Sequence, residues 1–408
     1  MTGTLETAAI RAAFPALMRQ HNGHPVAYFD GPGGTQVPTS VIAAMTDYLA
    51  HHNANTHWVY PTSLETDAML HAARETFAAF FHGAPDEVVF GNNMTTLSFH
   101  VARALGRGWQ AGDEVILTEL DHHANVAPWQ ALARERGIVL KWLPLDLGSF
   151  QLRLDLLPSL IGPRTKLLAI GAASNALGTI NDVASAAAVA RNAGVLVYVD
   201  GVHYAPHVLP DVAALGCDFF ACSSYKFFGP HVGVLWGRRA LLQSLDVPRL
   251  EPAPDHAPDR LETGTQNHEG IIGAAAAVEW LASLAGEAGS LRSRLVRAYA
   301  ALHARDLALF ARLWEGLGAI PGVTRYGPPP GTPRTGTVSF RFAGVSAESI
   351  ARRLAQEGCF VSNGDFYATT VARLLGASDD GFVRVGIAAY STADEVDRVV
   401  AGVGRCAP

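Results

Sequence analysis

The sequence predicts an α/β protein in which helices wrap a mostly parallel sheet and a smaller α+β part follows. Between about residues 87 and 240, short β-branched runs alternate with longer segments of helical period, which is the pattern of βαβ units. After about residue 265 the order changes to a long helical stretch and then strand-like runs. Because 408 residues exceed the size at which a single core keeps growing, we expect two domains with separate cores.

The change of pattern also places the expected domain boundaries. We expect an N-terminal segment, residues 1–25, that packs with the small domain. A large domain then covers residues 26–265, and a small C-terminal α+β domain covers residues 266–408.

Seven runs predict the strands of the large sheet. In chain order they are EVVF, EVILTEL, VLKWLPL, TKLLAIGAA, VLVYVD, FFACSS and VGVLWG. Before VLVYVD, the segment DVASAAAVARNAG has apolar residues at helical spacing and stops at Gly194, so its apolar face should pack on the sheet. These apolar residues are Val183, Ala186, Ala187 and Ala190.

The small domain is expected from three kinds of segment. Residues 271–318 predict helix, and the proline-rich loop at 327–335 predicts a connector. The runs TVSFRFAG, CFVSNG and GFVRVGIAAY predict strands.

Charge and composition exclude several classes of function. The formal charge of -6 and the scattered basic residues argue against nucleic acid and against a polybasic membrane surface. The N-terminus lacks a basic region followed by an apolar one, and no segment approaches roughly eighteen uncharged apolar residues, so we expect a soluble cytoplasmic protein. The cysteines lack metal-ligand spacing, and we expect reduced structural thiols at Cys217, Cys222, Cys359 and Cys406.

The first candidate site residue is Lys226 in SSYKFFGPH, which lies among aromatic residues where the run FFACSS ends. A lysine in that place either extends past the rings into water or is a Schiff-base lysine that burial keeps partly neutral. The other strand ends bear on this choice, because ligand groups in open α/β sheets gather at the carboxyl ends of the strands.

Three other strand ends carry polar groups. VLVYVD continues into GVHYAPH with Asp200 and His203, EVILTEL continues into DHHAN, and EVVF continues into GNNMTT, which opens a helix. Thr95 taken alone is a helix cap, but a helix N-terminus with free amides and hydroxyls also suits a phosphate. An anion cradle, an aromatic ring, a carboxylate and an amine together are the parts that hold pyridoxal phosphate.

The ordered motifs GNNMTT, DHHANVAPW, SNALGT, DGVHYAPH, CSSYKFFGPH and RLETGTQNHEG resemble those of the class V aminotransferase family, and specifically of its cysteine-desulfurase-like branch. The resemblance extends from AYFDGPGGTQVP near residue 27 to VRVGIAAYSTADEVDRVV near residue 400. It implies a fold-type I pyridoxal-phosphate enzyme with a mostly parallel seven-stranded sheet. It also implies pyridoxal 5'-phosphate as the cofactor and an α-amino acid as the substrate.

The resemblance implies a role for each matching residue around the cofactor. Lys226 would form the internal aldimine, Asp200 would pair with the pyridinium nitrogen, and His122 would stack on the ring. His203 stands where the desulfurases usually have a glutamine that hydrogen-bonds the phenolic oxygen, a task that an imidazole N–H can perform. The implied phosphate contacts are Thr95, Ser223, Tyr225 and the backbone of Met94.

Further matches imply a shared site and a substrate pocket. Thr265 matches a residue that in this family reaches the phosphate of the neighbouring subunit, which implies a homodimer with shared active sites. Asn175 would lie near the cofactor oxygen and the substrate carboxylate, and His57 would be a further substrate-binding residue. Arg384, inside the apolar run FVRVGIAA, would bind the carboxylate as a bidentate fork, unless it pairs structurally with a nearby acid.

The chain departs from the desulfurases where their nucleophile lies. Desulfurases need a mobile cysteine thiolate on the loop after a small-domain strand, and this loop reads CFVSNGDFYA here. The cysteine position holds Tyr367, and Cys359 lies back in the strand. Trp58 also stands where the desulfurases tend to carry an arginine. We therefore expect a desulfurase-like enzyme that lacks the catalytic cysteine.

These features predict an enzyme that binds an α-amino acid as an external aldimine, removes its α-proton with Lys226 and breaks a bond at the β or γ carbon. That reaction makes the protein a lyase, with carbon–sulfur cleavage as one form, rather than a persulfide-forming desulfurase. Transamination is the alternative, followed by epimerisation, because all three reactions share one quinonoid intermediate and differ in the next proton transfer.

Three other classes of function fit the residues less well. A metal-dependent hydrolase is disfavoured because adjacent histidines in DHHAN rarely converge on one ion and the proline in HYAPH breaks the helical HxxxH geometry, so we expect no metal site. A catalytically silent binding protein is disfavoured by the intact Asp200 and Lys226. A dinucleotide enzyme is disfavoured because DGPGGTQ does not complete GxGxxG.

Overall fold

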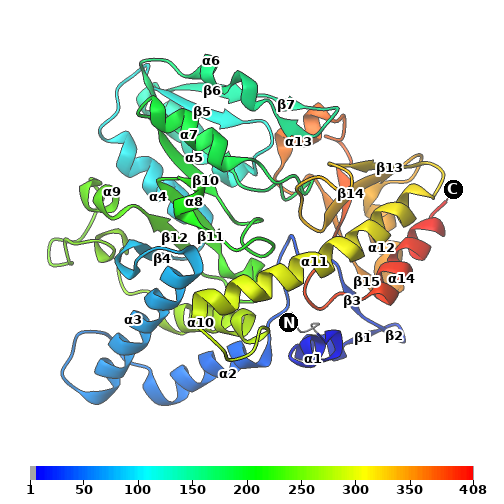
Figure 1. Cartoon of the computed structure of the whole chain (residues 1–408), viewed down its shortest axis with the longest axis horizontal. Helices are drawn as coiled ribbons and strands as arrows, with labels where there is room; N and C mark the ends of the chain where they lie inside the picture. The colour runs from blue at the N-terminus through cyan, green and yellow to red at the C-terminus, as the bar shows by residue number, and fades with distance from the viewer. Residues whose placement is uncertain (1–5, 408) are drawn as a thin grey trace.

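The computed structural model describes residues 6–407 and contains a large and a small sheet with helices packed on both (Figure 1). The large sheet has seven strands in the order β4-β12-β11-β10-β9-β5-β6. All neighbouring pairs except those of β12 are parallel, and β12 is antiparallel to β11 and to β4. The bounds are β4 (Val88–Gly91), β5 (Glu114–Thr118), β6 (Val139–Leu143), β9 (Thr165–Gly171), β10 (Leu196–Asp200), β11 (Phe219–Ser223) and β12 (Gly233–Gly237).

Alternating residues of these strands face two separate cores, as the period of two in a strand requires. In β10, Val197 and Val199 belong to one core, and Tyr198 between them belongs to the other. The helices that contribute to the first core include α3 (Pro61–Phe81), α6 (Leu157–Leu160), α7 (Val183–Asn192), α8 (Val212–Leu215) and α10 (His268–Ser283). Those of the second are α4 (Met94–Gly106), α5 (Ala127–Arg136) and α9 (Arg239–Ser244).

The helix expected before VLVYVD is confirmed as α7. All four residues of its expected apolar face are buried in the core of the large sheet. The helix ends at Asn192, and Gly194 follows with a φ of 71°, a left-handed conformation that glycine adopts without a steric cost.

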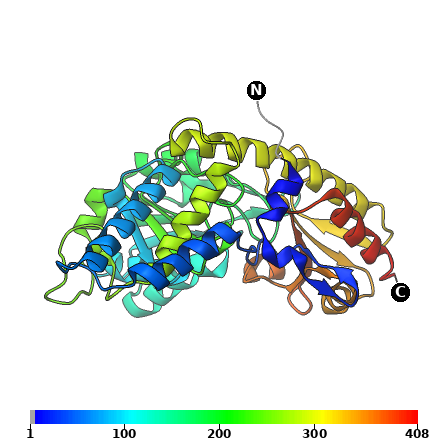
Figure 2. The same ribbon diagram turned by 90° about the horizontal axis from the view of Figure 1, so that it is seen from below.

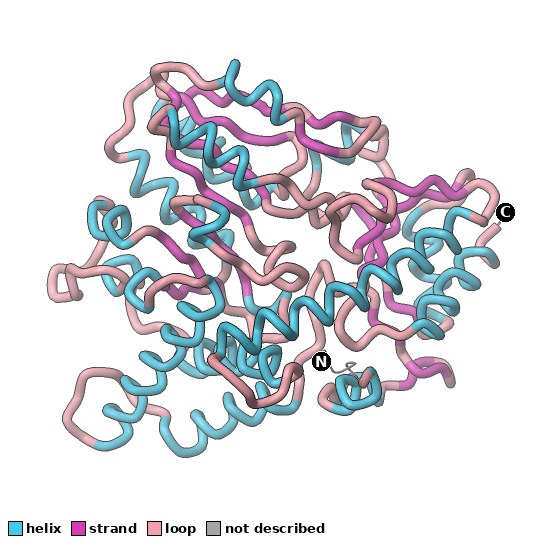
Figure 3. Tube along the Cα trace, viewed as in Figure 1, coloured by secondary structure: helices cyan, strands magenta, loops and turns pink. Residues whose placement is uncertain are grey.

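The small sheet is antiparallel throughout and has the order β13-β14-β17-β16. Its strands are β13 (Val323–Tyr326), β14 (Thr337–Phe342), β16 (Ser362–Gly364) and β17 (Phe382–Gly386). Three helices pack against it: α12 (Ala347–Gln356), α14 (Ala393–Gly404) and the C-terminal part of α11 (Leu291–Gly318). Figure 3 shows the strands gathered in these two places.

Helix α11 contacts both parts of the molecule, and Figure 2 shows it running along both. Leu295 and Tyr299 near its start belong to the core of the large sheet, whereas Phe310 and Leu313 belong to the core of the small sheet. Helix α10 packs against α2 (Thr39–Asp47) and α3 as well as against α11. The division at residue 265 stays a prediction.

The N-terminal segment contacts both parts of the molecule, because Ile10 and Phe14 belong to the core of the large sheet while Arg11 contacts a helix of the small sheet, so its packing with the small domain alone stays a prediction. It contains α1 (Thr7–Ala12), β1 (Gln20–His21) and β2 (His24–Pro25), β3 (Ala27–Tyr28) follows it directly, and residues 1–5 lie outside the described part. Arg11 forms an ion pair of 2.9 Å with Glu395 of α14. Strand β3 pairs in parallel with β15 (Cys359–Phe360).

The expected strands differ from the structure in a few places. The run CFVSNG forms two short strands, β15 and β16, that belong to different sheets. The expected helix at 271–318 is two helices, α10 and α11, because residues 284–290 with Gly286 and Gly289 at positive φ interrupt it. Strand β13 was not expected from the sequence. The remaining elements are β7 (Leu145–Asp146), β8 (Gln151–Leu152) and α13 (Thr369–Leu374).

Within residues 6–407, no helix combines the length and the apolar character that crossing a membrane requires.

Candidate active site

Nine of the predicted site residues line one cavity of about 580 Å³ at the carboxyl ends of the central strands. Asp200 ends β10, Ser223 ends β11, and both strands run in parallel, so their final residues meet at the same edge of the sheet. The nine residues are Met94, Thr95, His122, Asn175, Asp200, His203, Ser223, Tyr225 and Lys226.

The Lys226 amine is directed into the protein rather than into water. Its Nζ donates hydrogen bonds to the carbonyl oxygens of Pro32 at 2.5 Å and Gly33 at 2.8 Å. Burial, assisted by the charge of Arg384, lowers the pKa of Lys226 to about 8, against the opposing influence of Asp30 and Asp200. A lysine with this pKa is partly neutral near physiological pH, which favours the Schiff-base hypothesis over a side chain that extends into solvent.

Asp200 is buried at the bottom of the same cavity. Burial raises the pKa of its carboxyl to about 6, although the Val202 amide, which donates to Oδ1 at 2.9 Å, and the charge of Lys226 both favour the ionised form. A cationic partner is therefore the group that this carboxylate lacks. Sequence reasoning missed Asp121, a second buried carboxyl whose Oδ1 accepts the amide of Gly171 at 2.5 Å, and Gly171 is the residue that pairs with Asp200 between β9 and β10.

His122 presents a neutral imidazole to the cavity. Its Nδ1 accepts the Ala124 amide at 3.0 Å, so the proton of the neutral ring is on Nε2. Burial, then the charges of Lys226 and Arg384, lowers the pKa of His122 to about 4. The Tyr367 ring lies 5.5 Å away between centroids.

The N-terminus of α4 forms one end of the cavity. Asn93 caps the helix by accepting the Thr96 amide at 2.9 Å, and the Met94 amide donates to Ser223 Oγ at 3.0 Å. The exposed residues Thr95 and Thr96 also line this end, and the Thr96 hydroxyl donates to Asn93 Oδ1 at 3.1 Å. Helix N-termini with free hydroxyls and amides suit a phosphate. Tyr225 stacks on His231, with 4.8 Å between the ring centroids; neither His231 nor Thr96 was expected from the sequence.

Arg384 is buried in β17 beside a second cavity of about 1000 Å³, which Lys226, His122 and Asn175 also line. Its Nη1 donates to the Asn175 carbonyl oxygen at 3.2 Å, and its guanidinium lies 4.0 Å above the Phe366 ring. Burial lowers the pKa of Arg384 to about 10, although Asp30 counteracts it.

The acid nearest to Arg384 is Asp30, with 3.6 Å between Nη2 and Oδ1. Its side chain is half-exposed, and its Oδ1 also accepts the hydroxyl of Ser362, which in turn accepts Arg384 Nη2 at 3.2 Å. The Arg384 Nε has no partner within residues 6–407. The structural ion pair that the sequence left open thus exists, but it leaves part of the guanidinium free. Sequence reasoning missed Asp30 and Ser362.

Tyr367 lies on the loop that forms a wall of the second cavity. Its side chain is 70% exposed, and Phe366 and Tyr367 both have a φ of 57°, which is costly for residues other than glycine. Cys359 is buried in β15 and lines neither cavity, and burial raises the pKa of its thiol. The structure therefore brings Tyr367, and not Cys359, to the site.

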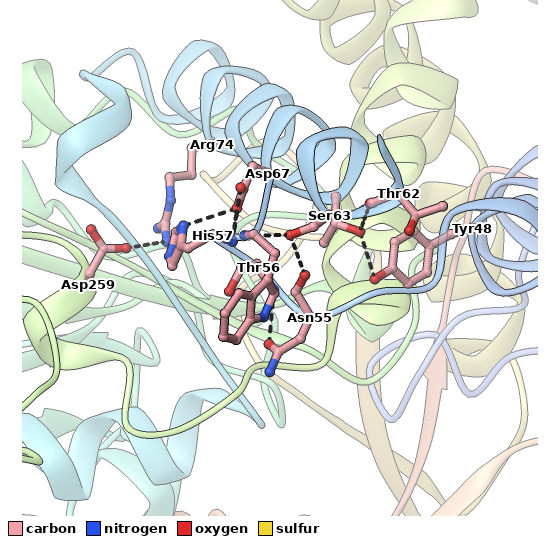
Figure 4. Close-up of polar contacts among 11 residues, drawn as sticks. Tyr48, Asn55, Thr56, His57, Thr62, Ser63, Asp67, Arg74 and Asp259 are labelled. Carbon is pink, nitrogen blue, oxygen red and sulfur yellow. Dashed lines mark hydrogen bonds and ion pairs between the residues drawn. The ribbon is translucent and has the colours of Figure 1, made fainter. Parts of the chain in front are cut away.

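His57 and Thr265 do not reach the Lys226 cavity of their own chain. Figure 4 shows His57 beside Asp67 of α3, where its Nδ1 lies 3.2 Å from Oδ1 of that carboxylate. The His57 side chain is 78% exposed and its φ is 67°. Trp58 next to it is also exposed, and its amide donates to Ser63 Oγ at 2.9 Å. Thr265 is exposed as well.

The residues present fit pyridoxal phosphate. The cavity combines a lysine, a buried carboxylate without a cationic hydrogen-bond partner, a neutral imidazole and a helix N-terminus. Three buried polar atoms around it have no hydrogen-bond partner within the described chain: Asn175 Oδ1, His203 Nδ1 and Arg384 Nε. Buried polar groups are rarely left unpaired in native proteins, so these atoms indicate that the site binds a polar ligand. In residues 6–407 no cluster of three or more His, Cys, Asp or Glu side chains could hold a metal ion.

Comparisons with known proteins agree with this geometry. The model of the class V aminotransferase family matches residues 27–399. A cysteine desulfurase of Serratia proteamaculans (strain 568) is 35% identical over 412 residues, covering 97% of this chain and 97% of the relative. The apo structure of a cysteine desulfurase from Thermococcus onnurineus NA1 has a TM-score of 0.89 at 27% identity and covers 99% of each chain.

A further solved structure shows the fold alone. It is a C-DES variant with glycine covalently linked to its pyridoxal phosphate cofactor, and it has a TM-score of 0.80 at 21% identity, covering 97% of this chain and 98% of its own. The fold expected from the sequence, the fold-type I architecture of pyridoxal-phosphate enzymes, is confirmed by these likenesses. Because the family model spans most of the chain and the desulfurases match it from end to end, the protein belongs to the class V aminotransferase family and is related to the cysteine desulfurases within it.

Proposed function

We propose that this chain is a pyridoxal-phosphate-dependent lyase that acts on an α-amino acid and breaks a bond at its β or γ carbon. The observation that carries the proposal is the placement of a partly neutral Lys226 and a buried Asp200 in one cavity that ends at a helix N-terminus. Class V aminotransferases and cysteine desulfurases depend on pyridoxal 5'-phosphate, and it is the cofactor of this chain.

The residues that would hold the cofactor form two groups, one suited to its phosphate and one suited to its ring. Met94, Thr95, Ser223 and Tyr225 surround the end of the cavity suited to the phosphate, and Asp200 lies where a carboxylate can pair with a ring nitrogen. When bound, pyridoxal phosphate links to amines and takes up the electrons left on the α-carbon when a bond to it breaks. An ionised Asp200 supports that chemistry because it keeps the ring nitrogen protonated.

Lys226 is the proposed general base. A pKa of about 8 leaves a useful fraction of neutral amine near pH 7, and its neighbours Pro32 and Gly33 offer carbonyl oxygens that steady the amine between proton transfers. The same Nζ can return the proton to a nearby carbon or leaving group. His122, which is neutral, presents a flat apolar face to the cavity without adding charge.

Arg384 and Asn175 are the proposed carboxylate-binding residues. The guanidinium has an unpaired Nε, and its Nη2 is only 3.6 Å from Asp30, so an incoming carboxylate finds one free donor and a second that it can take over from Asp30. The Asn175 side chain donates to the Phe366 carbonyl oxygen at 2.9 Å through Nδ2, which fixes its orientation beside Arg384.

Tyr367 supports lyase chemistry over persulfide formation. A phenolic hydroxyl is a poor sulfur acceptor beside a thiolate, and the Cys359 thiol is buried away from both cavities. Sulfur released from a substrate would therefore leave as a small molecule. The absence of a catalytic cysteine stays part of this proposal.

We further propose a homodimer whose active sites are shared. The support is that His57 and Thr265 are exposed and lie outside the cavity of their own chain, as expected for side chains that complete a neighbouring site. Trp58, Val59 and Tyr60 beside His57 expose apolar surface that such a contact would cover. The cytoplasmic location stays a prediction.

The reaction type is tested by offering the purified protein a panel of amino acids, with and without a keto-acid acceptor, and identifying the products. A lyase gives ammonia and a keto acid, or a released sulfur compound, at a rate that the acceptor does not change. Turnover that requires the acceptor would instead identify an aminotransferase, and inversion of the α-carbon without other products would identify an epimerase.

A further inference from the structure

His203 has two ring nitrogens in different surroundings. Its Nε2 lies 3.0 Å from Oγ1 of Thr335 and 3.2 Å from Oγ1 of Thr337. Its Nδ1 is buried and has no hydrogen-bond partner within residues 6–407, although the side chain lines the Lys226 cavity. The two hydroxyls are therefore the groups that decide which nitrogen carries the proton.

Counting donors separates the two neutral forms of the ring. If Nε2 carried the proton, it could donate to one threonine, while the other hydroxyl would lose its partner and Nδ1 would be a buried acceptor without a donor. If Nδ1 carries the proton, the single Nε2 lone pair can accept from Thr335 at 3.0 Å and be shared with Thr337 at 3.2 Å, and the buried group left over is an N–H. Both threonines are buried, so neither hydroxyl has water as an alternative.

The threonines are held in place by a segment that lies between the two parts of the molecule. Within residues 333–337, the Thr335 amide donates to the Gly178 carbonyl oxygen at 2.8 Å, and the Ile180 amide donates to the Pro333 carbonyl oxygen at 3.3 Å. The buried Arg334 guanidinium lies 3.7 Å above the Phe310 ring of α11. Because this segment is bonded to residues 178–180 on one side and packs on α11 on the other, the side chains of Thr335 and Thr337 hold a fixed orientation toward His203.

We propose that Thr335 and Thr337 are positioning residues that hold His203 as the neutral Nδ1–H tautomer, so that its Nδ1–H is the donor offered to the ring oxygen of the cofactor. The second half of this statement rests on the proposed function, whereas the first half concerns the chain alone. His203 stays neutral because burial lowers its pKa well below the usual range, assisted by His207, whose ring centroid lies 5.1 Å away, and by Arg384 and Lys226. A glutamine at this position needs no such arrangement, because its amide always has donors.

The tautomer can be read directly by nitrogen-15 NMR of the full chain labelled at histidine, without cofactor. A protonated and an unprotonated ring nitrogen have well-separated shifts, and His203→Gln identifies the His203 signals among those of the 16 histidines. We expect a protonated Nδ1 and an unprotonated Nε2. A protonated Nε2 in the wild-type protein overturns the proposal, whether or not any variant folds.

Matched variants test the part played by the hydroxyls. Thr335→Val with Thr337→Val should give a mixture of tautomers and raise the cofactor dissociation constant about tenfold, as expected for one weakened hydrogen bond. Thr335→Ser with Thr337→Ser should keep both values, because the hydroxyls remain. Thr179→Val is the structural control, since Thr179 is buried in the same region but donates to the Phe150 carbonyl oxygen at 2.8 Å instead.

The outcomes also separate this inference from the proposed function. If the valine pair changes neither tautomer nor cofactor affinity, or if Thr179→Val changes both equally, the positioning role is wrong. If the tautomer and its dependence on the hydroxyls are as expected but the protein binds no pyridoxal phosphate, the proposed function fails while the role of the threonines in setting the His203 tautomer stands.

Discussion

Arg384 and Asp30 form an incomplete ion pair, with 3.6 Å between Nη2 and Oδ1, inside a cavity that also contains Lys226. A buried guanidinium with an unpaired Nε binds a carboxylate more strongly than this single contact allows. In the proposed function, Asp30 balances part of the charge of Arg384 before a substrate carboxylate binds there.

We expect Arg384→Lys to weaken amino-acid binding by about 100-fold, because the lysine keeps one flexible contact and loses a charge-assisted hydrogen bond worth up to roughly 3 kcal/mol. The measurement is the dissociation constant of an unreactive amino acid, and its binding is monitored through the change in the absorption spectrum of the holoprotein. Asp30→Asn is the matched control and should bind the same amino acid more tightly. Equal affinity in wild type and Arg384→Lys would show that the guanidinium has only a structural role.

Asp200→Asn should stabilise the protein without cofactor at high pH. The folded-state pKa of Asp200 is raised from 3.8 to about 6, so the folded protein binds the proton more tightly than the unfolded chain and loses stability as the pH rises from about 4 to about 6. At about 1.36 kcal/mol per pKa unit, this costs wild type about 3 kcal/mol of its free energy of unfolding between pH 4 and pH 8. Asp200→Asn has no such group, so its stability relative to wild type should rise by that amount over the same range. Denaturant unfolding at the two pH values measures this difference, and a pH-independent difference would contradict the raised pKa.

Lys226 should react as an amine with a low pKa. The chain has three lysines, and Lys141 and Lys166 serve as internal controls for Lys226. Because the lowered pKa of about 8 makes the neutral amine available at lower pH, reductive methylation of Lys226 in the cofactor-free protein should rise with a midpoint near pH 8. Mass spectrometry of the three lysine peptides measures the rates. A Lys226 midpoint at or above pH 10 would show that burial does not lower its pKa.

Incubating the holoprotein with cysteine should leave no protein-bound persulfide. Among residues 6–407, Tyr367 lines the second cavity and the buried Cys359 lines neither, which is the arrangement expected if, as proposed, the chain lacks a catalytic thiolate. Persulfide detection on wild type and on Cys359→Ala provides the measurement and its control. A persulfide on wild type that disappears in Cys359→Ala would identify the protein as a desulfurase and overturn the role assigned to Tyr367.

The sequence predicted the parts of the fold and site that depend on local pattern. β-Branched runs identified the seven strands of the large sheet, and the rule that ligands bind at strand ends placed Asp200 and Lys226 in one cavity. The helical spacing of Val183 and Ala186 likewise identified the buried face of α7. In each case the position of a residue is determined by its neighbours in the sequence or in the sheet.

Other features depend on contacts between distant segments, which a sequence pattern does not reveal. Asp30 reaches Arg384, and Thr335 reaches His203, only because the two parts of the molecule meet there. The run CFVSNG divides into β15 and β16 because its first residues pair with β3, which directly follows the N-terminal segment. The exposed position of His57 follows from the loop before α3 and its contact with Asp67, which no local pattern indicated.

Borohydride reduction tests the central claim most directly. The holoprotein should absorb in the visible, and reduction should bleach that band and fix the cofactor on a single peptide. Of the three lysines, Lys141 is ion-paired with Glu114 at 2.7 Å and Lys166 is partly exposed, whereas only Lys226 lines the cavity with Asp200. Peptide mapping should therefore find the label on Lys226 alone. A label on Lys141 or Lys166, or no label on any lysine of a protein that binds the cofactor, would contradict the account.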